Sequence, residues 1–326
     1  MAVYTTVDDA ALAGFLADYE IGGPLAFKGI AEGVENSNYF LETETGKFIL
    51  TLFEKRVSPD DLPYFIGLKR HLAAKGFPCP RPVAARDGDA LRTLCGRPAI
   101  IVTFLEGLSP NRPSVTQCRE MGAGLARMHA ALADFEAVRP NGLGPAAWPR
   151  LWAGRRDGAE ALQPGLAAEI EDDLAVVAAA RDVSGALPRG TIHADLFPDN
   201  AFFVGERFSG VIDFYFACSD ALAYDIAVCL NAWAFEEDPG AHALQYNFSK
   251  GAAFLAGYGR ERALAPAELD ALPVLARGAA LRFFLTRLVD WTDTPPEALV
   301  KPKNPLEYAQ RLRFHRHAAG AGDYGA

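Results

Sequence analysis

Four polar residues near the middle of the chain have the types and the spacing that one kind of chemistry needs. They are His193, Asp195 and Asn200, within residues 191–203, and Asp213 a short distance further on. Asp195 can orient a hydroxyl group and accept its proton. Asn200 and Asp213 offer the hard oxygen ligands that Mg²⁺ prefers. Together these groups predict phosphoryl transfer, in which metal ions offset the charge on the phosphate oxygens.

The spacing His193-x-Asp195-x-x-x-x-Asn200 is that of a protein-kinase catalytic loop, and Asp213 stands where a kinase has its second metal-binding aspartate. Apolar runs flank both polar clusters and predict short strands with a loop between them. We expect His193 to pack and hydrogen-bond so that it holds the shape of this loop. The alternative is a chance coincidence of residue types, which the Ile-Asp-Phe run at residues 212–214 makes less attractive.

Composition bounds the class of protein. The 326 residues predict two lobes, and 50% hydrophobic with 22% charged residues is ordinary for a globular enzyme. A net charge of −9 without a basic block argues against nucleic acid as a partner. Five scattered cysteines predict neither a disulfide framework nor a zinc site, and favour a reducing cytoplasm. We expect no membrane span and no signal segment.

The hydrophobic pattern changes along the chain and predicts an α+β, bilobal architecture. Strands at 25–30, 38–43, 47–53, 91–95 and 98–105, with helices at 7–20 and 61–75, form an N-terminal nucleotide-binding lobe, residues 1–105. A Pro/Gly-rich hinge opens the mostly helical lobe 106–326, whose first helix begins with a capping box at Ser114 and Gln117. Further helices are predicted at 164–181, 220–236, 242–257, 266–291 and 305–318, before a mobile Gly-rich tail.

Two segments of the first lobe are candidates for binding ATP. Residues 29–38 include Gly29, Gly33 and Ser37, whose amides and hydroxyl can approach phosphate. A polar hairpin turn without a ligand would explain the same residues equally well. The segment Thr103, Phe104 and Leu105 offers backbone groups for the adenine edge; the alternative is a plain buried strand.

These motifs resemble those of the aminoglycoside-phosphotransferase and choline-kinase superfamily of small-molecule kinases. The likeness covers most of the chain and rests on residues 29–41, 48–56, 76–82, 193–200 and 211–217. It implies a protein-kinase-like fold, ATP and Mg²⁺ as cofactors, Asp195 as the base, and Asn200 and Asp213 as metal ligands. It also implies that Asp225 braces the catalytic loop from the start of a helix.

One departure concerns the lysine–glutamate pair that kinases place in the small lobe. Thr51 occupies the expected lysine position on the third strand, and the 61–75 helix has no glutamate. Lys28, Lys47 or Lys55 could reach the phosphates in its place.

Within the superfamily the N-terminal stretches resemble homoserine kinases, which implies phosphorylation of L-homoserine, a step of threonine biosynthesis. A buried arginine is costly unless paired, so Arg282 or Arg287 is a candidate for the substrate carboxylate. The alternative is an internal ion pair with Asp290 or Asp293. The residues Tyr215 and Asn231 could line the pocket.

Other acceptors stay open at this point: choline, methylthioribose or an aminoglycoside, and, as a different class, a nucleotide-binding pseudokinase. We expect a monomer or a homodimer. His315 and His317 diverge on their helix and predict a solvated helix end rather than a metal site.

Overall fold

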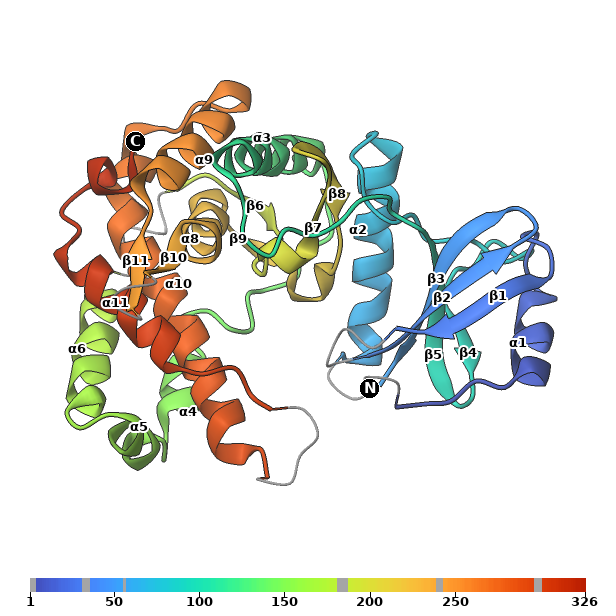
Figure 1. Ribbon diagram of the computed structural model, residues 1–326, viewed down its shortest axis with the longest axis horizontal. Coiled ribbons are helices and arrows are strands. Elements are labelled where there is room, and N and C mark those ends of the chain that lie inside the picture. The colour runs from blue at the N-terminus through green and yellow to red at the C-terminus, as the bar shows by residue number, and fades with distance from the viewer. Residues whose placement is uncertain (1–3, 31–35, 55–56, 181–186, 239–242, 296–300) are drawn as a thin grey trace. The chain divides into compact units, whose positions relative to one another are not determined.

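The computed structural model describes residues 4–30, 36–54, 57–180, 187–238, 243–295 and 301–326. The chain divides into two units (Figure 1). Unit 1 comprises Met1–Gly107 together with Ser209–Tyr215, and unit 2 comprises Leu108–Phe208 and Phe216–Ala326. The sequence predicted two lobes that are each continuous in the chain. In the structure, unit 1 also contains the seven residues Ser209–Tyr215, which follow the catalytic loop.

Unit 1 is built on a five-stranded antiparallel sheet with the strand order β1-β2-β3-β5-β4. The elements in chain order are α1 (Asp9–Leu16), β1 (Pro24–Gly29), β2 (Asn36–Thr43), β3 (Gly46–Phe53), α2 (Leu62–Ala74), β4 (Arg92–Leu94) and β5 (Arg97–Thr103). The strands and helices predicted here from periodicity are confirmed, with ends shifted by a few residues.

The alternation of side chains along β3 gives each face of the sheet its own core. Leu50 and Leu52 face one core together with Leu12 and Phe15 of α1. Phe53 and Ile100 belong to the other core, which α2 covers with Leu62 and Ile66. Successive residues of a strand point to opposite faces, so one amphipathic helix can cover each face. In Figure 1 α1 and α2 accordingly lie on opposite sides of the sheet.

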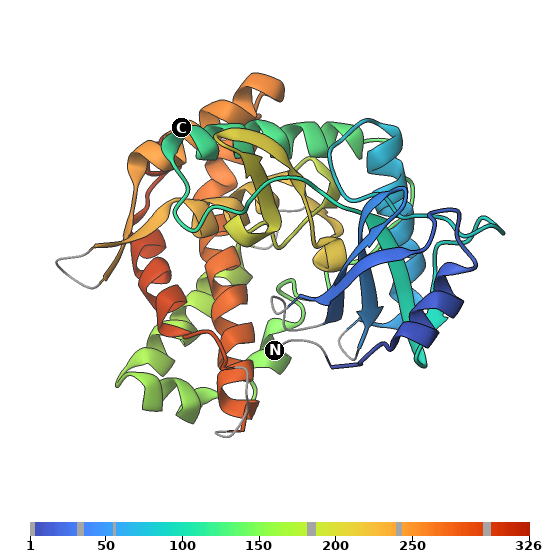
Figure 2. The same cartoon turned by 45° about the vertical axis from the view of Figure 1, so that its right-hand side comes forward.

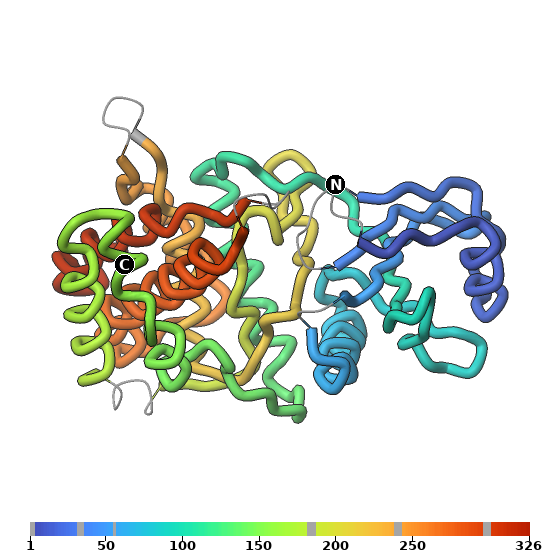
Figure 3. The backbone as a smooth tube through the Cα atoms, turned by 90° about the horizontal axis from the view of Figure 1, so that it is seen from below, coloured from blue at the N-terminus to red at the C-terminus, as the bar shows by residue number. Residues whose placement is uncertain are grey.

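Unit 2 is mostly helical. Its larger helices are α3 (Val115–Ala131), α6 (Leu166–Ala179), α8 (Leu222–Trp233), α9 (Phe248–Glu261), α10 (Pro266–Asp293) and α11 (Leu306–His317), with the short α4 (Trp148–Trp152) and α5 (Arg156–Leu162). The capping box predicted at Ser114 and Gln117 is confirmed. In Figures 2 and 3 the long α10 runs through this unit with α11 beside it. None of the helices in the described part of the chain combines the length and apolar character that crossing a bilayer requires.

The described part of unit 2 also contains pairs of short strands. β6 (Arg189–Ile192) pairs antiparallel with β9 (Cys218–Ala221). β7 (Ala201–Val204) pairs with β8 (Arg207–Val211), and β10 (Phe235–Asp238) pairs with β11 (Ala243–Tyr246). The sequence pattern missed β9 and β10. The helix predicted at 242–257 starts too early, because residues 243–246 form β11 and α9 begins at Phe248.

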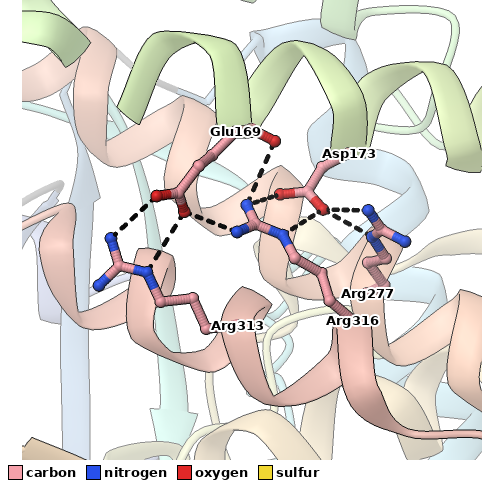
Figure 4. A network of polar contacts seen from close by, with 5 residues as sticks. All are labelled: Glu169, Asp173, Arg277, Arg313 and Arg316. Atoms are coloured by element: carbon pink, nitrogen blue, oxygen red, sulfur yellow. Dashed lines mark hydrogen bonds and ion pairs between the residues drawn. The ribbon is translucent and has the colours of Figure 1, made fainter. Parts of the chain in front are cut away.

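An ion network joins three helices of unit 2 (Figure 4). Asp173 of α6 is fully buried and pairs with Arg277 of α10, whose Nε lies 2.6 Å from Oδ1. Arg316 of α11 binds both Asp173 and Glu169. Removing a partner from such a group would leave a buried charge unpaired, so the network fixes α6 against α10 and α11.

Two sequence predictions about the C-terminus are wrong. The tail is not loose, because residues Ala321–Tyr324 form a 3-10 helix that buries Tyr324 completely. His315 is not solvated either: its ring nitrogens lie 2.9 Å from the Tyr324 hydroxyl and 2.9 Å from Asn231 Oδ1. Burial lowers the pKa of His315 to about 3, so this histidine is neutral in the core.

We predict that Gly257→Ala destabilises unit 2, because α3 and α9 approach closely at this glycine. A methyl group on Gly257 would lie 2.0 Å from the Arg119 carbonyl oxygen, a contact that backbone cannot relieve cheaply. The expected loss is about 2–3 kcal/mol. Gly259→Ala, on the same helix with nothing within 4 Å of the added methyl group, should stabilise by about 1 kcal/mol. Thermal and urea melts of the two variants should therefore move in opposite directions.

Candidate active site

The catalytic loop follows β6 and is held by one carboxylate. The backbone N–H of His193 donates to Asp225 Oδ2 at 2.7 Å, and that of Ala194 donates to Oδ1 at 2.8 Å. Ala194 has φ 63°, a left-handed conformation that costs a residue with a side chain about 1–2 kcal/mol. Asp225 lies in the first turn of α8 and is fully buried. Its two hydrogen bonds hold the turn that presents Asp195.

Asp225 is kept ionised by a second histidine. His129 of α3 places Nε2 3.2 Å from Asp225 Oδ2, and its Nδ1 lies 2.9 Å from the Tyr258 hydroxyl. A carboxylate only accepts, so Nε2 carries the proton and Nδ1 accepts from Tyr258. Burial acts to raise the pKa of Asp225, but the hydrogen bonds from His129 and from the His193 amide outweigh it and hold the pKa below its usual value.

Asp195 follows Ala194 in this loop. Its side chain is 18% exposed, and burial raises the pKa of its carboxyl, while Arg282 and His193 act in the opposite direction. The Asp195 backbone N–H donates to His193 Nδ1 at 3.3 Å, which fits the loop-shaping role predicted for that histidine. A general base works best when its pKa approaches the working pH, so a raised pKa suits a proton acceptor.

Asn200 lies in the 3-10 turn Pro198–Asn200 before β7. Its Nδ2 donates to the Asp195 carbonyl at 2.8 Å. This bond fixes the amide orientation and leaves Oδ1 as the acceptor of the side chain. An amide oxygen held in this way is the kind of donor that Mg²⁺ takes.

Arg282 of α10 lies against Asp195. Its Nη1 donates to the Ala194 carbonyl at 2.9 Å and lies 3.4 Å from Asp195 Oδ1. Its Cζ stacks 3.9 Å from the centroid of the Phe283 ring, and the residue is only 3% exposed. Among the described residues, none accepts a hydrogen bond from its Nε or Nη2. Arg282 therefore has donors left for a further anion next to the candidate base.

The other residues predicted to bind substrate have different surroundings. Arg287 donates to Glu307 Oε2 at 2.7 Å and to the Asn304 carbonyl at 3.1 Å. Asn231 is fully buried, and its Nδ2 donates to the carbonyls of Ala227 and Ala276. These contacts occupy the Asn231 side chain inside unit 2 but use only Nη1 of Arg287. The binding roles of both residues stay predictions.

Two of the residues predicted to bind ATP, Ser37 and Thr51, make hydrogen bonds to other residues of unit 1. The Ser37 hydroxyl donates to Glu54 Oε1 at 2.6 Å and accepts the Tyr4 amide at 2.8 Å. Thr51, in the position expected for lysine, donates to Asn38 Oδ1 at 2.8 Å. Gly29 ends β1.

Gly33 and Lys55 lie outside the described residues. At the predicted adenine edge, the Thr103 hydroxyl accepts the Arg81 amide at 2.9 Å, and the Phe104 amide donates to the Lys47 carbonyl at 3.1 Å. The ATP-binding roles of these residues and of Leu105 stay predictions.

Asp213 belongs to unit 1 and has φ 62°, again in the left-handed region. Tyr215, two residues on, packs edge-on against Phe53 of β3 and Phe65 of α2. The side chain of Lys69 from α2 lies beside this tyrosine, with Nζ 3.5 Å from the hydroxyl. Tyr215 thus packs inside unit 1, and its predicted substrate role stays a prediction.

Sequence reasoning missed Lys69 and His129. A signal was present for the lysine: Leu62, Ile66, Lys69 and Leu72 follow helical spacing, so the lysine falls on the buried face of α2. The same signal marks His129, because Met121, Leu125 and His129 follow helical spacing on the buried face of α3. Its partner Asp225 lies 96 residues away in sequence and has no local signal.

Comparison with known proteins now defines the class. A family model described as a phosphotransferase enzyme family matches residues 26–272. Among solved structures, the chain superposes on an amicoumacin kinase in complex with AMP-PNP and Ca²⁺ with a TM-score of 0.66 and 18% identity, covering 95% of this chain and 92% of that one. A choline kinase from Cryptosporidium parvum gives a TM-score of 0.62 at 14% identity, covering 95% and 94%. At these identities the likeness confirms the predicted kinase-like α+β fold.

Two curated relatives are far more similar. A homoserine kinase of Hyphomonas neptunium is 67% identical over 100% of both chains. A homoserine kinase of Brucella anthropi is 55% identical over 100% of this chain and 98% of that protein. The chain belongs to the phosphotransferase enzyme family and, within it, to the homoserine kinases. The family resemblance drawn from the motifs is confirmed.

We predict that Arg282→Gln shifts the acid side of the pH–rate profile. Arg282 lowers the pKa of Asp195, so its loss should raise that pKa further. Less of the base is then ionised at a given acidic pH, and the acid limb of kcat/KM should move to higher pH. A profile measured from pH 5 to 9 checks this.

Arg313→Gln removes an equal charge from unit 2, but the partner of Arg313 is Glu169, so its profile should match that of wild type. An unshifted profile for Arg282→Gln would remove Arg282 from the electrostatics of Asp195.

Proposed function

We propose that the protein transfers the γ-phosphoryl group of ATP to the hydroxyl of L-homoserine, giving O-phospho-L-homoserine and ADP. The observation that carries this is the buried loop of unit 2, in which Asp225 holds the backbone, Asp195 faces out and Arg282 lies beside it. The full-length relatives that are named homoserine kinase support the choice of acceptor.

The residues of the loop suit a single in-line displacement. Asp195 would accept the proton of the homoserine hydroxyl while the new O–P bond forms and the bond from the γ-phosphorus to ADP breaks. The raised pKa that burial gives Asp195 makes it a better proton acceptor than a solvated carboxylate. His193 and Asn200 would act through the backbone of the loop and keep the base in place.

The donor set fits a hard divalent cation. Asn200 of unit 2 has its amide oxygen free of the bond that fixes its nitrogen. The carboxylate of Asp213, in unit 1, is the second ligand that the sequence predicts. Among the described residues no group of three or more His, Cys, Asp or Glu side chains gathers as a metal site. Phosphate oxygens and water would therefore supply the other ligands of Mg²⁺. Mg²⁺, when bound, would offset the charge of the phosphates.

Arg282 is the residue we assign to the substrate carboxylate. The hydroxyl oxygen of homoserine is four bonds from its carboxylate carbon, so a substrate whose hydroxyl contacts Asp195 brings its carboxylate close by. The unused Nε and Nη2 of Arg282 form the planar edge that binds a carboxylate in two hydrogen bonds. Stacking on Phe283 holds the guanidinium plane.

Choline, methylthioribose and aminoglycosides are less favoured as acceptors, because none of them carries a carboxylate for Arg282 to bind. A pseudokinase has no need of a buried base with a raised pKa. The prediction of a monomer or homodimer stays a prediction.

We expect ADP release from MgATP to depend on L-homoserine, and Asp195→Asn to abolish it. The asparagine keeps the size of the side chain but cannot accept the proton, so the loss should be at least about a thousandfold. Binding of a fluorescent ATP analogue should be unchanged in the variant, which separates catalysis from folding. Turnover that survives in Asp195→Asn would contradict the role of this residue as the base.

We predict that Arg282→Gln lowers kcat/KM for L-homoserine about a hundredfold more than for 3-amino-1-propanol, which has the same hydroxyl and amine but no carboxylate. Losing a charged hydrogen-bonding pair costs about 3 kcal/mol. The effect of Arg282 on Asp195 is common to both acceptors and cancels in the ratio. Arg287→Gln, measured in parallel, decides between the two arginines: a larger change in the ratio for that variant would reassign the carboxylate to Arg287.

A further inference from the structure

A buried ammonium group in unit 1 lies beside Tyr215, two residues from Asp213. Lys69 of α2 is only 5% exposed. Its Nζ donates one long hydrogen bond, 3.5 Å, to the Tyr215 hydroxyl and lies 5.0 Å from the centroid of that ring. Among the described residues no carboxylate forms an ion pair with it. Two of its three donors are therefore left without a described partner. The tyrosine ring beside it is itself packed against Phe53 and Phe65.

Such a group costs stability. Burial lowers the pKa of Lys69 to about 8, while Cys79 and Asp213 act to raise it, so the charged form predominates at pH 7. A buried ammonium with one weak hydrogen bond and one aromatic ring beside it is poorly compensated for the water it has lost. A methionine in this place would pack equally well without that penalty. A costly group at such a position is more often retained for function than for the fold.

The neighbours of Lys69 indicate what that function is. Tyr215 lies in the 3-10 turn Phe214–Phe216, directly after Asp213. Lys69 and this turn therefore join α2 to the residue proposed to bind metal. The left-handed backbone at Asp213 is a conformation that persists only where its surroundings hold it. The contact of Lys69 with Tyr215 is one such constraint. The electrostatic attraction between the Lys69 ammonium and the Asp213 carboxylate is a second.

Kinases usually couple the corresponding helix to the site through a strand lysine and a helix glutamate. Here Thr51 replaces the lysine and is bonded to Asn38, and α2 contains no glutamate. In the described part of unit 1 the buried lysine is Lys69 on the helix, whereas Lys47 on strand β3 is exposed.

We propose that Lys69 is a positioning residue of the phosphotransfer reaction: it anchors the turn of Asp213 and Tyr215 to α2 and so holds the Asp213 carboxylate in the orientation that binds Mg²⁺. This inference rests on the proposed function for its reaction and on unit 1 alone for its geometry.

The test is Lys69→Met in the full-length protein. We expect kcat to fall at least tenfold, the Mg²⁺ concentration for half-maximal rate to rise at least threefold, and KM for L-homoserine to stay within twofold. The melting temperature should equal or exceed that of wild type, since a buried charge has been removed. A purely structural lysine would change activity only in step with stability.

Two comparisons sharpen the result. Lys75→Met removes the same charge from an exposed position at the end of the same helix, and should leave kcat and the Mg²⁺ dependence as in wild type. Tyr215→Phe keeps the ring but removes the hydroxyl. If Lys69 acts through this turn, the double variant should be no slower than the slower single variant, whereas independent effects would multiply.

Several results would overturn the inference: a Lys69→Met protein that melts below wild type or does not fold, a kcat within threefold of wild type, or an unchanged Mg²⁺ requirement. Failure of the proposed function looks different. Wild type would then not turn over L-homoserine, yet Lys69→Met would still weaken Mg²⁺-dependent binding of a fluorescent ATP analogue, which needs no acceptor. If wild type turns over homoserine and the lysine variant behaves identically, only the positioning role is lost.

Discussion

The catalytic loop depends on one buried carboxylate, that of Asp225. It accepts the amides of His193 and Ala194 and a ring N–H of His129, so three donors compensate its lost hydration. With these bonds the left-handed turn at Ala194 is stable, and without them the turn would relax toward an ordinary conformation. Because Asp195 is the next residue, the direction of the candidate base follows from this arrangement.

Each unit keeps a cation out of water next to a residue with a predicted catalytic or metal-binding role. Arg282 is nearly buried beside Asp195, and its cation opposes the effect of burial on the pKa of that carboxyl. In unit 1, Lys69 is buried with Asp213 as a charged neighbour. Each of these groups costs free energy in the folded protein. A site that has to stabilise developing charge is the usual place for such costs, because fixed charges act more strongly where water is excluded.

The remaining polar groups of unit 2 mainly stabilise the scaffold. The network of Asp173 and Glu169 with arginines of α10 and α11 keeps the long helix that carries Arg282 in place. His315, bonded to Tyr324 and Asn231, anchors the C-terminal residues to the same helices. These contacts join residues far apart in the chain, and the sequence pattern had assigned several of them to solvent or to the substrate.

The sequence by itself determined what depends on near neighbours. The alternation along β3, the capping box at Ser114 and the spacing from Asp195 to Asn200 could all be read within a window of a few residues, and they predicted the strands, the helix start and the catalytic loop. Only the tertiary structure decided which buried cations face the loop and the Asp213 turn. Arg282 and Arg287 are five residues apart on one helix and look alike in sequence, yet one contacts Asp195 and the other Glu307. Local patterns fix which face of an element is apolar. They do not fix which residue of a distant element meets it, because that depends on the packing of the whole unit.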